Sequence, residues 1–440
     1  MDFLPRLTFL LACLFFSFLY GFAASQFQWW PHGFLSRALS EAKNTGSAST
    51  IAQHHTYPAR HDLQGVRSYG DEPSAGGATL VTSYWPDRDG LPGLRLIDSA
   101  GATLHHWDAN PARIWPTSPH EDSAKGLLNQ SSNYVHGSYL FPNGDVLFNI
   151  EFLGLARLDA KGDVIWRVDR RTHHSVTPDE NGNFWVCEAV WVETEELRKG
   201  RFPGLTLPLV EDRVLLVSPE GKILEQISIL EIVFESELKD LVWRIGKMRS
   251  GDILHLNDVE SLSTAMAAEY PMFEAGDLLV SSRFLDAVFV VDPDTKKVKW
   301  SAHEPFMNQH DPDFIGDGWI SVFDNHGDES LDGSFLGGSR LLALRPHTGE
   351  SRGIYPREPS GSEHERYFYT LRGGKAQQLE NGNWLVTESQ SGRVFEIDGD
   401  GKTVWEWVHA RRADGFSISE VLEGSRYQIT AQDVGIWKSR

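Results

Sequence analysis

The sequence predicts an all-β fold, a six-bladed β-propeller preceded by an N-terminal hydrophobic helix. Two hairpin patterns alternate along the chain, and each occurs six times. The outer pattern recurs at a mean interval of 60 residues, because five intervals separate Asp98 from Asp398. Two hairpins in each interval make four strands, which is the size of one propeller blade.

The composition favours an aromatic-rich β protein over a helical one. The 440 residues include 15 Trp and 40 Gly but only 5 Met, a mixture typical of strands and tight turns. The net charge of -20 argues against nucleic acid as a partner, because phosphate binding needs a basic surface.

An apolar run at residues 7–24 follows Arg6 and has two interpretations. Small residues at 23–25 would suit cleavage of a signal peptide, whereas Trp29 and Trp30 resemble the aromatic belt of an uncleaved anchor. We expect a single-helix membrane anchor, with a cleaved signal as the alternative. Both place the rest of the chain on the extracytoplasmic side, which is periplasmic, lumenal or secreted.

The predicted domain organisation has three parts. Residues 1–30 form the anchor or signal peptide, and residues 76–440 form the propeller. Residues 31–75 have weak periodicity and many small polar residues, so we expect a juxtamembrane linker there.

The copies of the two hairpins can be placed along the chain. Outer hairpins lie at 93–101, 154–166, 213–222, 287–294, 340–349 and 393–405. Inner strands, which lead to a glycine turn, begin near His136, His174, His255, His310, Lys375 and Phe416. The first outer hairpin has no inner strand before it and the last inner strand has no outer hairpin after it. We therefore expect the C-terminal strand to complete the first blade. The sequence leaves open whether 78–84 or 427–430 is the second strand of that blade.

Four segments interrupt the repeat. A helix-like stretch at 230–242 lies within an insertion at 229–254, and a second insertion occupies 263–275. Long connections also occur at 109–132 and 356–372. Long loops in a compact fold are often functional.

The inner strands of a propeller line its channel and begin at one face, so the residues that open them converge. This places His136, His174, His255 and His310 around one mouth, and alternation along the strand selects His174 rather than its neighbour His173. The strand at 278–283 ends in Arg283, whose planar fork suits oxyanions. Imidazoles with a guanidinium predict a site that handles an anionic group, and a His nucleophile flanked by donors predicts group transfer.

Simpler roles compete with this interpretation. A lone His at a strand start, such as His136, is usually a hydrogen-bonding residue. A three-histidine metal site is an alternative, although the charge of Arg283 would repel a cation there. Arg283 could instead pair with Asp286 or Asp258.

Polar pairs and cysteines are interpreted as structural. The pairs 257–258 and 324–325 are interpreted as turn and channel-wall hydrogen-bonding groups. Of the two cysteines, Cys13 lies in the apolar run, so Cys187 has no partner for an intrachain disulfide and a cysteine-ligated zinc site is excluded.

Several of these segments resemble the arylsulfotransferase family, six-bladed propellers that use aryl sulfate donors. The segments that carry the resemblance are 173–178, 255–260, 280–283, 309–311 and 322–325. Their order and spacing also fit, and the resemblance covers roughly residues 78–430.

The resemblance implies a mechanism for this chain. His310 would become transiently sulfated, and His174, His255 and Arg283 would bind the sulfuryl oxygens. The donor would be an aryl sulfate and the acceptor a phenol, with no nucleotide sulfate donor, no metal and no cofactor. Some bacterial members carry a disulfide near the site, which this chain cannot form.

Two other functions remain open. One is a non-catalytic propeller that binds a ligand or partner through its long loops. The other is a quinoprotein-like propeller, because residues 398–405 resemble the tryptophan-docking hairpins of quinoprotein dehydrogenases. Those enzymes usually have eight such units and a Ca²⁺ site, whereas six are present here.

Overall fold

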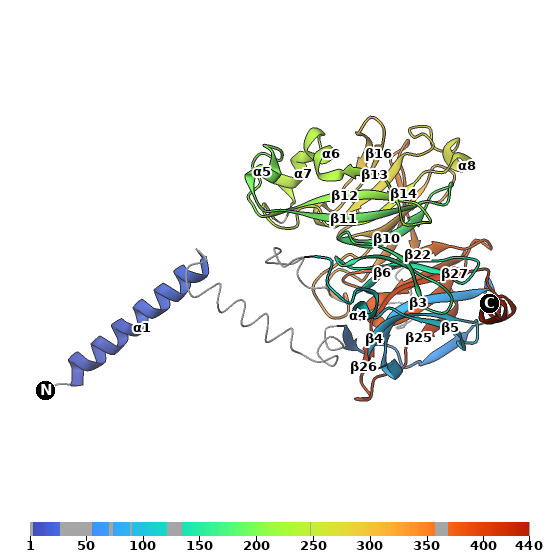
Figure 1. The fold of residues 1–440 in the computed structure, drawn as a ribbon, viewed down its shortest axis with the longest axis horizontal. Helices are drawn as coiled ribbons and strands as arrows, with labels where there is room; N and C mark the ends of the chain where they lie inside the picture. The colour runs from blue at the N-terminus through green and yellow to red at the C-terminus, as the bar shows by residue number, and fades with distance from the viewer. Residues whose placement is uncertain are drawn as a thin grey trace. The chain divides into compact units, whose positions relative to one another are not determined.

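The fold is given by a computed structural model, which describes residues 3–26, 55–69, 74–88, 90–120, 134–246, 248–356 and 368–439. The chain divides into two compact units, Met1–His54 and His55–Arg440. The second unit is all-β and contains six blades arranged around a channel (Figure 1). This confirms the predicted six-bladed propeller.

The first three blades, with strands given from the channel outward, are as follows. Blade 1 contains β27 (Val421–Tyr427), β3 (Ala78–Trp85), β4 (Leu91–Ile97) and β5 (Thr103–Asp108). Blade 2 contains β6 (Val135–Leu140), β7 (Val146–Ile150), β8 (Gly154–Leu158) and β9 (Val164–Val168). Blade 3 contains β10 (Thr172–Pro178), β11 (Phe184–Val192), β12 (Leu209–Val217) and β13 (Ile223–Ser228).

The other three blades follow the same antiparallel order. Blade 4 contains β14 (Leu256–Ser261), β15 (Leu278–Ser282), β16 (Ala287–Asp292) and β17 (Lys297–Ala302). Blade 5 contains β18 (His310–Phe314), β19 (Ile320–Asp324), β20 (Arg340–Arg345) and β21 (Glu350–Tyr355). Blade 6 contains β22 (Lys375–Gln378), β23 (Trp384–Glu388), β24 (Arg393–Ile397), β25 (Thr403–Val408) and, at its outer edge, β2 (Gly65–Ser68).

The C-terminal strand closes the ring, as predicted. β27 pairs antiparallel with β3, with Val421 opposite Ser83 and Tyr427 opposite Ala78. The second strand of blade 1 is therefore β3, which resolves the choice that the sequence left open. The inner strands contact one another in the circular order β27, β6, β10, β14, β18, β22 and back to β27.

The boundary predicted between linker and propeller needs a correction. Residues 55–69, which we assigned to the linker, belong to the propeller unit. β1 (Thr56–Pro58) pairs with β26 (Ser417–Ser419), and β2 extends blade 6 through β25. Val66 packs against the apolar cluster around Trp405 and Trp407, which explains why this segment joins the sheet. Residues 74–75 also belong to the propeller unit, whereas the linker positions 31–54 and 70–73 lie outside the described residues.

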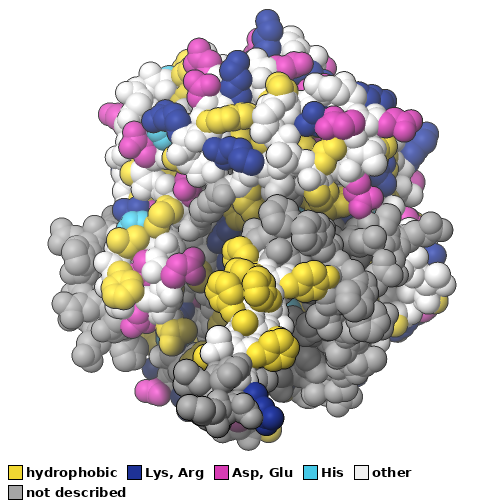
Figure 2. Space-filling view, turned by 90° about the vertical axis from the view of Figure 1, so that its left-hand side faces the viewer, with side chains coloured by type: hydrophobic (Ala, Val, Ile, Leu, Met, Phe, Trp, Pro, Cys, Tyr) yellow, Lys and Arg dark blue, Asp and Glu magenta, His cyan; other side chains and the backbone are white. Residues whose placement is uncertain are grey.

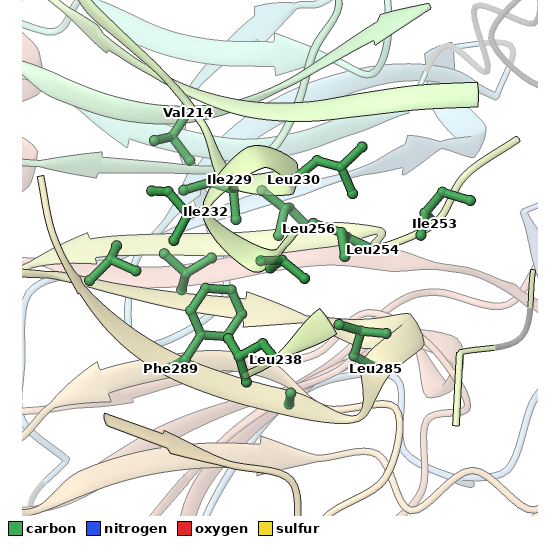
Figure 3. Packing of buried hydrophobic residues seen from close by; sticks show 14 of the residues in the cluster. Val214, Ile229, Leu230, Ile232, Leu238, Ile253, Leu254, Leu256, Leu285 and Phe289 are labelled. Atoms are coloured by element: carbon green, nitrogen blue, oxygen red, sulfur yellow. The ribbon is translucent and has the colours of Figure 1, made fainter. Parts of the chain in front are cut away.

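The insertion at 229–254 is helical, as expected, and fills the space between blades 3 and 4. It forms α6 (Ile229–Glu235) and α7 (Lys239–Arg244), with Ser228 as the N-cap of α6. Figure 3 shows the resulting core, in which side chains of α6 pack with Val214, Leu256 and Phe289. Burial of this many aliphatic side chains fixes the insertion against both blades.

Short helices complete the propeller unit. They are η1 (Pro86–Arg88), α4 (Pro111–Ile114), α5 (Glu195–Arg198), α8 (Thr264–Ala267), η3 (Arg283–Leu285), η5 (Ser389–Ser391) and α9 (Ala431–Ser439). The insertion at 263–275 contains α8 and buries Tyr270 and Phe273 between blades 4 and 5. Figure 2 shows one face, on which Lys and Arg side chains lie among Asp and Glu side chains.

The N-terminal apolar run forms α1 (Phe3–Gln26). Over the ranges of the chain that the structure describes, no helix combines the length and apolar character needed to span a membrane. Trp29 and Trp30 lie outside those ranges. The choice between an anchor and a cleaved signal stays a prediction.

Candidate active site

The four histidines predicted to converge do lie together, at the end of the channel where the inner strands begin. The ring of His174 is central: its centroid lies 4.3 Å from that of His136, 5.2 Å from His255 and 6.3 Å from His310. These four rings come from four consecutive blades. The in-phase positions of the inner hairpins therefore locate the cluster.

Backbone irregularities place these rings. The pairing of β10 with β11 skips between His173 and Val176, so His174 bulges out of the strand with φ +54°. His255 precedes β14 with φ +50°. Histidine is uncommon in this left-handed region, and such residues persist where the surrounding structure enforces them, often at functional sites.

Gly137 allows the blades to approach closely at this point. It has φ +82°, and a Cβ there would lie 1.9 Å from the carbonyl oxygen of His174. The same carbonyl accepts a hydrogen bond of 2.9 Å from Asn149 Nδ2. Blade 2 thus fixes the backbone of His174.

His310 is held in one tautomer by Asn325. Its Nδ1 lies 2.6 Å from Asn325 Oδ1 and 3.1 Å from the carbonyl oxygen of Asn308. Asn325 Nδ2 donates to the carbonyls of Thr370 and Gly373, so the amide oxygen is the atom that faces His310. Two acceptors at Nδ1 place the proton on that nitrogen. Nε2 is then left with a lone pair.

The surroundings keep His310 neutral. Burial, followed by the nearby positive charge of Arg283, holds the pKa of His310 well below its ordinary value, although the hydrogen bond to Asn325 acts in the opposite sense. A neutral imidazole with a free Nε2 is a nucleophile.

His255 forms a dyad with Asp252, which the sequence analysis missed. His255 Nδ1 lies 2.6 Å from Asp252 Oδ2, and the side chain of His255 is 23 % exposed, whereas His174 and His310 are buried. Burial alone would raise the pKa of Asp252, but the contacts with His255 lower it. The intervening residues Ile253 and Leu254 are fully buried in the core of Figure 3. The insertion therefore anchors both members of the dyad.

His174 has different neighbours. Its Nδ1 lies 2.8 Å from Nδ1 of His173 and 3.6 Å from Glu151 Oε1. Burial and the surrounding histidines hold the pKa of His174 well below its ordinary value. The prediction that His174 alone points inward rested on regular strand alternation, and the bulge at His174 interrupts that alternation and brings the rings of His173 and His174 into contact.

Arg283 lies beside His255. Its backbone N–H donates to the carbonyl oxygen of His255 over 3.1 Å. Burial, followed by the positive charge of Arg372, lowers the pKa of Arg283. Its Nε is buried without a hydrogen-bond partner, and no carboxylate of the described residues forms an ion pair with it. The alternative pairing with Asp286 or Asp258 is therefore absent from this part of the chain.

A charged cluster lies directly beneath the histidines and was not foreseen. A cavity of about 20 Å³ is lined by both His310 and Asp258. Lys375 Nζ contacts Asp311 Oδ1 at 2.9 Å and Glu423 Oε1 at 3.4 Å in the same cavity wall. Burial, followed by the charge of Asp311, raises the pKa of Asp258 to about 7.

One group of residues has the arrangement of a metal site. Ligand atoms of His136, Glu151 and His174 lie within 4.8 Å of one another. Among the described residues, these three are the ones whose ligand atoms lie close enough together to hold a metal ion. It differs from the three-histidine site considered above because Glu151 takes the third place. His136 Nδ1 is buried without a hydrogen-bond partner.

A larger cavity lies elsewhere. It has a volume of about 510 Å³ and is lined by residues of blades 5 and 6, including Trp319, Arg352 and Trp384. None of the clustered histidines lines it.

The fold and the clustered side chains define a six-bladed propeller with imidazoles and a guanidinium at one mouth of its channel. Residues 138–411 match the model of the family described as Arylsulfotransferase (ASST). This match spans more than half of the chain, so the protein belongs to the arylsulfotransferase family. Membership indicates sulfuryl transfer in general.

The solved structures that match this chain are distant from it. A protein of unknown function from Bacteroides caccae is 14% identical, with a TM-score of 0.45, covering 76% of this chain and 93% of that one. TolB from Acinetobacter baumannii is 9% identical, with a TM-score of 0.44 and coverages of 80% and 67%. Virginiamycin B lyase from Staphylococcus aureus is 11% identical, with a TM-score of 0.38 and coverages of 78% and 88%. No curated protein sequence matches the chain.

Proposed function

We propose that this protein transfers a sulfuryl group from an aryl sulfate to a phenol through a sulfated His310. The observation that carries the proposal is the hydrogen bond from His310 Nδ1 to Asn325, which leaves Nε2 as a buried, neutral nucleophile. Membership of the arylsulfotransferase family supports the reaction class.

In the first half-reaction Nε2 of His310 attacks the sulfur of the donor. The new N–S bond forms as the S–O bond to the aryl group breaks, and the electron pair leaves on the phenolate oxygen. Charge on the three sulfuryl oxygens is stabilised by Arg283, whose fork is free of carboxylate partners among the described residues, and by N–H groups of the neighbouring imidazoles.

His255 is the proposed proton donor to the departing phenolate. Sequence reasoning left the choice open between His174 and His255. Burial and the neighbouring histidines oppose the protonation of His174. His255 has a carboxylate at Nδ1, and that contact orients Nε2. His174 then remains neutral and serves as a hydrogen-bond donor.

In the second half-reaction a phenol binds in the same place. Its proton passes to His255, its oxygen attacks the sulfur, and the N–S bond to His310 breaks. The balance closes because His255 regains the proton that it gave to the first phenolate. One site used twice requires ping-pong kinetics.

Steady-state kinetics of the purified propeller unit with a chromogenic aryl sulfate and a phenol test this proposal. Parallel lines in double-reciprocal plots are expected, and His310→Ala should abolish turnover. Intersecting lines would exclude a covalent intermediate. A folded protein that turns over no aryl sulfate would favour the non-catalytic binding propeller instead.

We also propose that the propeller acts outside the cytoplasm, delivered by the apolar N-terminal run. Arg6 before that run supports this orientation. N-terminal sequencing of protein from its native host distinguishes the two forms. A start near Gln26 would indicate a cleaved signal, and retention of residues 1–26 would indicate an anchor.

A further inference from the structure

The loop at 370–373 is fixed to the nucleophile by one side chain. Asn325, which binds His310, donates from Nδ2 to the carbonyls of Thr370 (2.9 Å) and Gly373 (2.7 Å) at the two ends of this loop. Thr370 Oγ1 donates to the carbonyl of Arg372 over 2.7 Å, which closes the loop from within. The backbone of Arg372 therefore has a fixed position relative to His310.

A second blade residue holds the same loop from its outer side. The N–H of Leu371 donates to Gln390 Oε1 over 2.9 Å. Gln390 also hydrogen-bonds the side chain of Tyr57, on the strand β1 that crosses beside blade 6. The loop is thus tied on one side to the catalytic histidine and on the other to an aromatic residue.

The guanidinium of Arg372 has no carboxylate partner among the described residues. Neighbouring cations do have one: Lys375 contacts Asp311 at 2.9 Å, and Arg393 contacts Glu406 at 2.7 Å. Arg372 is exposed, whereas Arg283 is partly buried. Arg283 and Arg372 are therefore both without an ion pair among the described residues.

Besides burial, the positive charge of Arg372 acts on Arg283 and lowers its pKa. Of the charged groups that act on Arg283, Arg372 has the largest effect, ahead of the carboxylates of Asp286, Glu329 and Asp252. The charge of Arg372 also acts on Tyr57. A single sulfuryl group bound at Arg283 neutralises one of these cations and leaves the other unpaired.

We propose that Arg372 is a second anion-binding residue of the site, which selects aryl sulfates whose ring carries a further oxyanion, such as a carboxylate. This inference rests on the proposed function. The sulfuryl group would contact Arg283 and His310, and the second anionic group would form a charge-assisted hydrogen bond with the fork of Arg372. Repulsion between the two arginines would be relieved only by a substrate with two negative charges.

Equilibrium binding to the full chain carrying His310→Ala tests the inference without turnover. The ligands are 4-carboxyphenyl sulfate and its methyl ester, which share a ring but differ by one charge. We expect the carboxylate to bind about 10-fold more tightly than the ester. Adding Arg372→Ala or Arg372→Gln should bring the two dissociation constants within about 2-fold of each other, mainly because 4-carboxyphenyl sulfate binds more weakly.

Arg352→Ala is the matched control. Arg352 is also exposed, and its substitution removes the same charge. Its side chain, however, stacks on Trp319 at the hairpin-turn end of the propeller. It should leave the preference unchanged. Equal binding of the two ligands in the His310→Ala protein would overturn the inference, as would a preference that survives both Arg372 variants. Turnover of the ester by the wild-type protein is judged separately, because it tests the proposed function alone.

Discussion

The amide oxygen of Asn325 lies 2.6 Å from Nδ1 of His310, and both residues are buried. The orientation of the amide is set independently, because its nitrogen donates to two carbonyls of the loop at 370–373. An acceptor fixed in this way holds the proton on Nδ1 and leaves Nε2 to react. Asn325 is therefore a positioning residue for the proposed nucleophile.

Asn325→Ala should lower kcat by about 100-fold with little change in KM, because the imidazole would no longer be held in the reactive tautomer. The ¹⁵N chemical shifts of the His310 ring should show a mixture of tautomers in this variant. Ser339→Ala is the control: Ser339 Oγ accepts from the N–H of Thr370 and donates to the Asn325 carbonyl, but does not touch His310. Equal losses in both variants would mean that Asn325 acts only through the loop.

Asp252→Asn should make the rate depend more strongly on the leaving group. The carboxylate holds the His255 ring in place through Nδ1, so its loss weakens proton donation to the phenolate. We expect about a 100-fold loss of kcat/KM with unactivated phenyl sulfate but less than about 10-fold with 4-nitrophenyl sulfate. A uniform loss across a series of leaving groups would contradict the assignment of His255 as the proton donor.

The fold followed from the sequence because its determinants are local and repeated. Each Asp- and Gly-rich turn between apolar runs specifies a hairpin. The last inner strand has no outer hairpin after it, and this predicted that the C-terminal strand β27 closes the ring. The boundary at residue 75 was wrong for residues 55–69, because β1 and β2 are short and become strands only by pairing with distant segments. Pairing at a sequence distance of more than 300 residues leaves no local pattern.

The candidate site was predictable only in part, for the same physical reason. His136, His174 and His310 each stand eight residues before a glycine of a turn, and His255 likewise stands at the start of an inner strand, so the repeat marks all four. The partners that set their chemistry do not recur: Asn325 follows β19, and Glu151 follows β7. Asp252 stands three residues before His255 and could have been suspected. The bulge that brings His173 against His174 depends on the pairing of β10 with β11.

Formation of the sulfated enzyme should be nearly independent of pH between about pH 5 and 8. Burial and Arg283 depress the pKa of His310, so the neutral, reactive form is already populated over this range and protons compete only at more acidic pH. Rapid-quench measurement of adduct formation with 4-nitrophenyl sulfate, which needs little proton donation, tests this. A rate that rises with an apparent pKa near 6.5 would show that His310 titrates as it does in an unfolded chain.

Glu260→Gln should reduce the amount by which the free energy of unfolding falls at alkaline pH. Burial raises the pKa of Glu260 to about 8, above its ordinary value of 4.5. Between these values the unfolded chain releases the proton and the folded protein keeps it, so the free energy of unfolding falls as pH rises through this window. Above about pH 8 the penalty is complete.

The glutamine keeps the acceptor for the N–H of Phe314, which now binds Glu260 Oε2 at 2.7 Å. Denaturant unfolding at pH 5 and pH 8 should show a smaller decrease for the variant than for the wild type, by on the order of a few kcal/mol. Glu380→Gln, at an exposed turn position, is the control. Identical decreases in wild type and Glu260→Gln would show that Glu260 ionises normally in the folded protein.

The account depends most directly on His310 as the residue that carries the sulfuryl group. Mass spectrometry of protein quenched with an aryl sulfate in the absence of acceptor measures this, with peptide mapping under conditions that preserve an N–S bond. We predict one sulfuryl adduct per chain, located at His310 and discharged when a phenol is added. An adduct at another residue, or full turnover by His310→Ala with no adduct, would contradict the account.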